Sequence, residues 1–77
     1  MLTTYPEIRD RIYKLAREHK LRVDWSETSR AWRTLRLFDA RQVEAAKAKV
    51  PVRNIQRQDL EQLSWDLQRV FEKGWME

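Results

Sequence analysis

The side chains that could carry out chemistry are few, and their types suit binding better than reaction. The chain of 77 residues has no cysteine and one histidine, His19. Thiolate metal sites, cysteine nucleophiles and multi-histidine metal sites are therefore excluded, and a Ser-His-Asp triad has little support. Gly74 is the only glycine, so there is no glycine-rich phosphate loop or dinucleotide-binding motif. We expect no metal, no cofactor and no enzymatic activity.

Basic side chains are concentrated in the middle of the chain. Residues 30–57 carry eight Lys and Arg residues against two acidic residues, which gives a net charge of +6. Residues 1–29 are nearly neutral at +1, and residues 58–77 are acidic at −3. A block of this charge density attracts phosphates or an acidic protein surface. The alternative is that these cations form an ordinary solvated surface.

The length of the chain limits it to one small domain, predicted to span residues 1–77. A chain of this size buries only about 60% of its unfolded surface, so we expect modest stability and self-association, as a homodimer. No apolar run approaches the ~18 residues of a membrane span, and the start of the chain lacks a signal sequence. These features predict a cytoplasmic binding domain that does not contact membranes.

Two segments carry strong helix signals, one near each end of the chain. Thr4 and Glu7 have the spacing of a capping box, and the apolar stripe that follows predicts a helix to about residue 20. A second stripe predicts a helix over 59–73, with Gly74 just beyond its end. The residues of this second stripe are Leu60, Leu63, Leu67, Val70 and Phe71.

The segment 21–38 fits two different structures. Residues 21–25 alternate between apolar and polar, which is typical of a strand. In a hairpin, this strand would pair with 32–38, but the residues between them include no Gly, Asn or Pro for a tight turn. We therefore predict a helix over 26–38. Its apolar side would consist of Ala31, Trp32, Leu35 and Phe38.

A further helix is predicted over 40–48. Asp39 and Gln42 have the spacing of a helix N-cap and its third residue, and the segment contains four alanines. Pro51 disfavours helix in the residue before it and therefore ends this element. Together, these signals predict an all-α fold, a compact bundle of about four short helices. The alternative is an α+β fold with one hairpin at 21–38.

The segment 39–57 has small and aliphatic residues at intervals typical of two packed helices. Ala45 is small where two helices would touch, Val50 would fill the space between them, and Ile55 follows Ala45 by ten residues. In these features the segment resembles the helix-turn-helix of phage repressors, excisionases and related small regulators. It departs from that family at the turn, where Lys49 replaces the usual glycine. The resemblance implies a second helix that enters the major groove of DNA. The alternative is that the segment is a purely structural joint between two helices.

The resemblance also implies which residues contact double-stranded DNA. Those facing the bases would be Arg53, Asn54 and Arg57, with Gln56 at the margin. Paired hydrogen bonds let arginine bind guanine and asparagine bind adenine. Those near phosphates would be Lys47, Lys49 and Arg41, and the basic block adds Arg33 and Arg36. The predicted function is that of a small DNA-binding regulator of the kind carried by phages and plasmids.

Four tryptophans are the second unusual feature of the sequence. Trp65 does not fit the apolar stripe of the last predicted helix, and Trp75 lies beyond its end. Because exposed tryptophans commonly anchor protein interfaces, these two predict a partner interface, with local packing as the alternative for each. The alternative function is therefore a small inhibitor or adaptor that binds a host protein or a nucleic-acid machine through its basic face. The run Arg30-Ala-Trp-Arg33 could also stack nucleobases, provided that it lies on an open surface.

Overall fold

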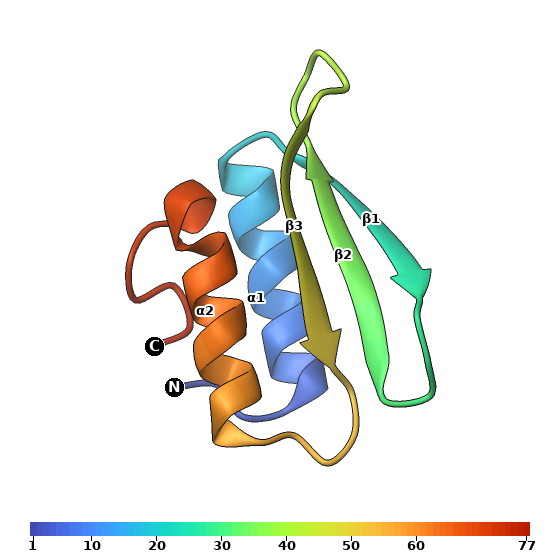
Figure 1. Cartoon of the computed structure of the whole chain (residues 1–77). Helices are drawn as coiled ribbons and strands as arrows, with labels where there is room; N and C mark the ends of the chain where they lie inside the picture. Colours follow the sequence, from blue (N-terminus) through green and yellow to red (C-terminus); the bar gives the residue numbers. More distant parts are fainter.

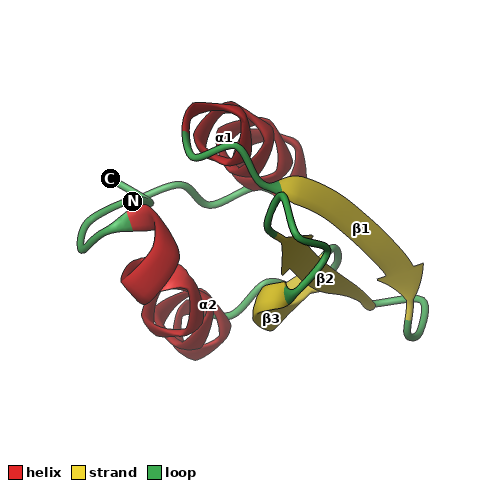
Figure 2. Cartoon of the chain, turned by 90° about the horizontal axis from the view of Figure 1, so that it is seen from above, coloured by secondary structure: helices red, strands yellow, loops and turns green.

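The computed structural model describes the whole chain, residues 1–77, as two helices and a three-stranded sheet. The elements in chain order are α1 (Tyr5–Glu18), β1 (Arg22–Glu27), β2 (Trp32–Phe38), β3 (Glu44–Pro51) and α2 (Arg57–Phe71). The strands are antiparallel and lie in the order β1-β2-β3. Both helices lie on the same side of the sheet (Figures 1 and 2). The molecule is therefore a two-layer α+β domain in which one face of the sheet has no helix over it.

The predicted all-α bundle is wrong. The alternative is right about the α+β class and about the hairpin at 21–38, but it lacks the third strand. In place of a helix over 26–38, β1 pairs with β2, with Val23 opposite Leu37 and Trp25 opposite Leu35. These four side chains belong to or pack against the hydrophobic core. They recur at every second residue, which suits a strand with one buried face and cannot form a single helical stripe.

The loop between β1 and β2 explains why the missing turn residues misled the prediction. The backbone N–H groups of Thr28 and Ser29 both donate to the carbonyl of Trp32, at 3.3 Å. The hydroxyls of Thr28 and Thr34 are hydrogen-bonded to each other, and the hydroxyl of Ser29 accepts from the N–H of Ala31 at 3.3 Å. No residue of this loop has a positive φ. Side-chain hydroxyls thus stabilise a turn that requires neither glycine nor asparagine.

The predicted helix over 40–48 and the helix-turn-helix over 39–57 are also wrong, because strand β3 runs through both. Ala46, Ala48 and Val50 are buried, whereas Lys47 and Lys49 are exposed. Alanine favours helices intrinsically, but this alternation with lysine has the period of a strand, and tertiary packing overrides the propensity.

The residues that imitate a helix N-cap in this segment form the β2–β3 turn. The side chain of Asp39 accepts hydrogen bonds from the N–H groups of Arg41 at 2.8 Å and Val43 at 3.1 Å. The N–H of Gln42 donates to the carbonyl of Asp39, and Gln42 has a φ of 64°. An aspartate side chain can satisfy backbone donors in a turn as readily as at a helix start, so the same signal serves both structures.

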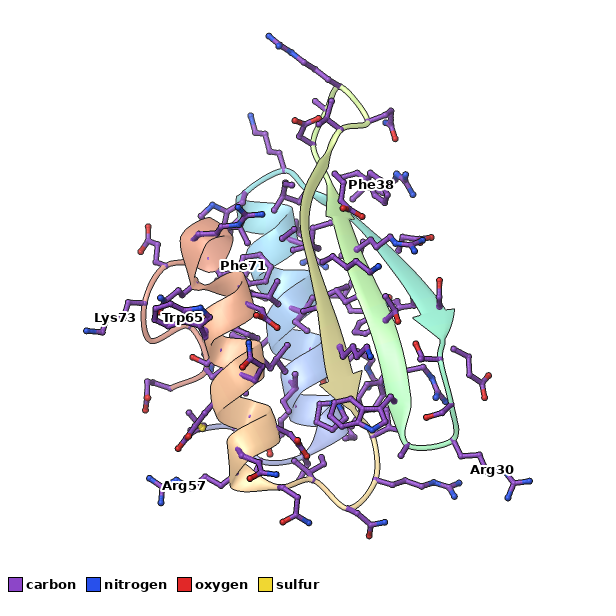
Figure 3. All side chains as sticks on the ribbon, viewed as in Figure 1. Arg30, Phe38, Arg57, Trp65, Phe71 and Lys73 are labelled. Carbon is purple, nitrogen blue, oxygen red and sulfur yellow. The ribbon has the colours of Figure 1, made fainter.

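A single hydrophobic core fills the space between the sheet and the two helices. α2 packs against β3, where the small side chains of Ala46 and Ala48 let the helix approach closely. Figure 3 shows Phe71 between α2 and the sheet. The buried apolar residues are Ile8, Ile12, Ala16, Leu35, Leu37, Ala46, Ala48, Val50, Leu60, Leu63, Leu67, Phe71, Trp75 and Met76.

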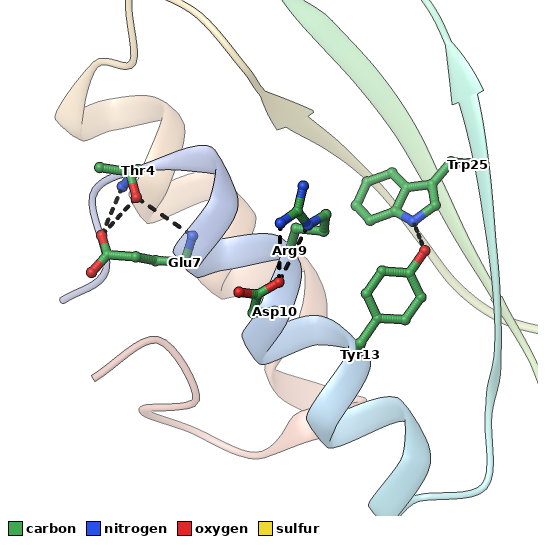
Figure 4. Close-up of polar contacts among 6 residues, drawn as sticks. All are labelled: Thr4, Glu7, Arg9, Asp10, Tyr13 and Trp25. Carbon is green, nitrogen blue, oxygen red and sulfur yellow. Dashed lines mark hydrogen bonds and ion pairs between the residues drawn. The ribbon is translucent and has the colours of Figure 1, made fainter.

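The two terminal helices are confirmed, with ends shifted by about two residues. α1 begins after Thr4, whose backbone and side chain form the predicted capping box with Glu7 (Figure 4). α2 begins two residues earlier than predicted and ends at Phe71. Gly74 lies beyond it in the left-handed region, with a φ of 82°. Of the predicted α2 stripe, all but Val70 are buried.

The capping box gives a testable pH dependence of stability. The Thr4 hydroxyl donates to the Glu7 carboxylate at 2.8 Å and thereby lowers the pKa of Glu7 below its ordinary value of 4.5. A carboxyl whose pKa is lower in the folded state stabilises the fold above its unfolded pKa. That stabilisation is lost as the pH falls through the folded pKa. We expect urea denaturation to show wild type more stable than Glu7→Gln at neutral pH, with the difference shrinking below about pH 4.5. A difference that does not change with pH would contradict this.

Candidate nucleic-acid interface

The face of the sheet turned away from the helices carries charged, polar and aromatic side chains. Strand alternation places there every residue that is not directed at the core, and the register aligns them in rows. We call this surface the open face. It consists of Arg22, Asp24 and Ser26 of β1, Trp32, Thr34, Arg36 and Phe38 of β2, and Glu44, Lys47, Lys49 and Pro51 of β3.

The open face is positively charged. It has four cations, Arg22, Arg36, Lys47 and Lys49, and two carboxylates. Arg36 forms an ion pair with Glu44 at 3.6 Å, while the two lysines have no ion pair. The acidic segment 58–77 forms α2 and the tail, which lie on the other side of the sheet. The fold therefore places most of the acidic end on the far side of the sheet from the open face, although Asp59 and Asp66 of α2 line a cavity with Lys47 and Lys49 at the edge of β3.

Two aromatic rings lie near opposite ends of β2 on the open face. Phe38 is directly opposite Arg22, and the guanidinium carbon of Arg22 lies 4.5 Å from the centre of the Phe38 ring. Trp32 is half-buried and lies opposite Pro51. The six residue steps from Trp32 to Phe38 correspond to about 20 Å of extended strand. Flat rings flanked by cations are the arrangement with which proteins bind unpaired nucleobases and their phosphates.

The structure distributes the residues predicted to lie near phosphates, together with Arg33 and Arg36, over three places. Lys47, Lys49 and Arg36 are together on the open face. Arg41 is exposed at the β2–β3 turn. Arg33 points to the helix side of the sheet, where its Nη1 atom donates to the carbonyls of Ser29 at 3.2 Å and Trp32 at 3.3 Å.

The residues predicted to read bases lie in the β3–α2 loop and the first turn of α2. Arg53, Asn54, Gln56 and Arg57 are all exposed, but no recognition helix presents them. Arg57 forms an ion pair with Glu61 at 3.2 Å, within α2. In Figure 3, Arg57 and Arg30 point outward at the same end of the molecule, Arg30 from the β1–β2 loop. These residues are peripheral to the open face.

Sequence reasoning missed Arg22 and Phe38 as candidate site residues. They are 16 positions apart and meet only because the hairpin register pairs them. The one signal that could have found Arg22 was the alternation over 21–25, which places it on the polar side of a strand. The run Arg30-Ala-Trp-Arg33 is a stacking candidate only if it lies on an open surface. β2 places Trp32 of this run on the open face.

The two tryptophans predicted to form a partner interface have opposite surroundings. Trp65 is 68% exposed, on the outer side of α2 (Figure 3). Trp75 is only 4% exposed, and its indole N–H donates to the carbonyl of Ser64 at 3.0 Å. Its ring packs edge-on against Phe71, with centroids 5.4 Å apart. For Trp75 the structure supports the alternative of local packing, because the tail folds back and makes this residue part of the core.

No cluster of His, Cys, Asp and Glu side chains could hold a metal ion. Neither helix has the length and apolarity needed to span a lipid bilayer. Comparisons with models of protein families, with curated proteins and with solved structures found no match to this chain.

Proposed function

We propose that this protein binds single-stranded nucleic acid on the open face of its sheet. The observation that carries the proposal is the combination, on one uncovered surface, of two aromatic rings with four cations. One base would stack on Trp32, and another on the guanidinium of Arg22, which already lies over Phe38. Lys47 and Lys49, which have no ion pair, would bind the phosphates between them.

A single strand fits this surface better than a duplex does. Bases in a duplex are stacked on one another, so aromatic side chains reach their faces only when the strand is unpaired. A duplex is read by elements that enter a groove, and the helices lie on the opposite side of the sheet from the open face. We still propose a regulatory role, which the protein would exert by binding single-stranded regions of DNA or RNA.

The proposal is tested by fluorescence anisotropy with labelled oligonucleotides of one sequence, as single-stranded DNA, single-stranded RNA and duplex DNA, over a series of salt concentrations. We expect either single strand to bind more tightly than the duplex. If all four cations contact phosphates, the slope of log affinity against log salt should be near −3, at about −0.7 per contact. Equal or tighter binding of the duplex would contradict the proposal.

The aromatic contribution is tested separately with Trp32. We expect Trp32→Ala to weaken single-strand binding by about 1–3 kcal/mol, roughly fivefold to 150-fold, because one base loses its stacking surface. Trp32→Phe should restore most of the affinity, and a thermal melt of each variant shows whether it is folded. The matched control is Trp65→Ala, which removes an exposed indole from α2. If both alanine variants lose affinity equally, the effect does not come from the open face.

One observation favours a second function, as an inhibitor or adaptor of another protein. Trp65 is the most exposed large apolar side chain of the domain, and large exposed rings are frequent anchors of interfaces. A second copy of this chain is the first partner to examine. If Trp65 joins two copies, wild type should sediment as a dimer at high concentration and Trp65→Ala as a monomer. A monomeric wild type would contradict the predicted homodimer. Trp65 would then be expected to bind a different protein.

A further inference from the structure

We propose that the outer edge of β3 is a docking site for an extended peptide in which acidic and basic residues alternate. The edge borders a cavity of about 370 Å³ between β3 and α2. Trp32, Lys47 and Lys49 line it from the sheet, and Asp59 and Asp66 line it from α2. The two lysines also belong to the open face, but the other side of the groove is formed by α2, which is not part of that face. This proposal therefore does not depend on nucleic-acid binding.

The backbone of β3 offers hydrogen bonds along this edge. The N–H of Val52 donates to the carbonyl of Ala31 at 2.8 Å, on the side of β2. Because backbone groups alternate in direction along a strand, Lys47 and Lys49 turn their N–H and C=O groups the other way, toward the groove. The carbonyl of Ala45, on the same edge, accepts from Arg69 Nη2 at 3.1 Å. A fourth strand could therefore pair at Lys47 and Lys49. The neighbouring carbonyl of Ala45 already accepts a hydrogen bond from Arg69 of α2.

The charges of the groove select the sequence of that strand. Successive side chains of an added strand point to opposite faces of the sheet. Those on the open face would lie beside Lys47 and Lys49, where acidic residues are favoured. Those on the other face would lie toward Asp59 and Asp66, where basic residues are favoured. Opposite charges on neighbouring strands stabilise pairing and like charges destabilise it, so acidic and basic residues should alternate along the peptide.

The same charges disfavour a second copy of this chain as the occupant. Pairing β3 with another β3 would place the lysines of both copies on one face. It would also bring the carboxylates of both α2 helices together on the other face. Lysines on an edge strand commonly discourage pairing with other sheets. Here they would disfavour pairing with most strands and favour a strand that has acidic residues beside Lys47 and Lys49.

The proposal is tested by NMR hydrogen exchange on isotope-labelled protein. The probe is a synthetic peptide of strictly alternating Glu and Lys residues. In the free protein, the amides of Lys47 and Lys49 should exchange fast, while those of Ala46, Ala48 and Val50 are protected. Adding the alternating peptide should slow exchange at Lys47 and Lys49. A peptide of the same composition, with Glu and Lys in two blocks, should have little effect, because each of its faces carries both charges.

Charge reversal separates this site from the open face. Asp66→Lys should weaken binding of the alternating peptide several-fold while leaving oligonucleotide affinity undiminished. The proposal is overturned if the alternating peptide gives no protection at Lys47 and Lys49, or if the block peptide protects them equally. It is also overturned if protection appears without peptide and grows with protein concentration, because the edge would then pair with a second copy.

Discussion

Replacing both lysines of the open face by glutamate is expected to weaken single-strand binding by about 100-fold at moderate salt. Lys47 and Lys49 are exposed and form no ion pair, so their charge is available to phosphates. The double variant Lys47→Glu/Lys49→Glu loses two contacts and adds two repulsive charges beside the strand. The salt slope should fall by about 1.4, the contribution of two phosphate contacts. Both quantities are measured in one anisotropy titration series.

The control for this variant changes the net charge by the same amount at a different place. Lys14 is exposed on α1, and Lys73 follows α2 (Figure 3). Lys14→Glu/Lys73→Glu should reduce affinity much less, because these charges lie on the helix side of the sheet, where salt screens their effect on the open face. If the two double variants lose affinity equally, binding depends on total charge, and the open face is not the site.

Truncating the core at Leu67 is expected to lower the free energy of unfolding by about 2–5 kcal/mol. The Leu67 side chain is fully buried in α2, and the alanine variant would leave a cavity in the only hydrophobic core of the domain. A single core in a domain of this size rarely provides more than about 3–5 kcal/mol in total. We therefore expect Leu67→Ala to be largely unfolded at 25 °C. Urea denaturation followed by far-UV circular dichroism measures this loss.

An exposed residue on the same helix provides the reference for the core effect. Trp65→Ala removes a larger side chain, but from a position that is 68% exposed. Its effect on stability should lie within about 0.5 kcal/mol of wild type. If Leu67→Ala were equally harmless, the packing of α2 on β3 would not be what stabilises the domain.

The sequence by itself determined the two helices at its ends. In each of them, local interactions and tertiary packing favour the same structure. Thr4 and Glu7, which cap α1, are only three residues apart in the sequence. The apolar stripe of α2 has the helical period throughout. The absence of cysteine and of histidine pairs likewise excluded several kinds of chemistry without any knowledge of the fold. The concentration of positive charge in the middle of the chain was also visible from the order of the residues.

Only the tertiary structure decided the middle of the chain, where local signals were ambiguous. The alanines of β3 favour helix in isolation, and Asp39 can cap either a helix or a turn. Burial of Ala46, Ala48 and Val50 beneath α2 selects the strand, and this contact joins segments that are distant in sequence.

The candidate site depends on the same long-range choice. Arg22 meets Phe38 only through the β1–β2 register, and Lys47 reaches the row of Arg36 only through β2–β3 pairing. A shift of one residue in either register would turn these side chains toward the helices. The sequence therefore determined which charges the protein carries. The sheet decided that they share one surface, because register is fixed by burying the opposite face against both helices.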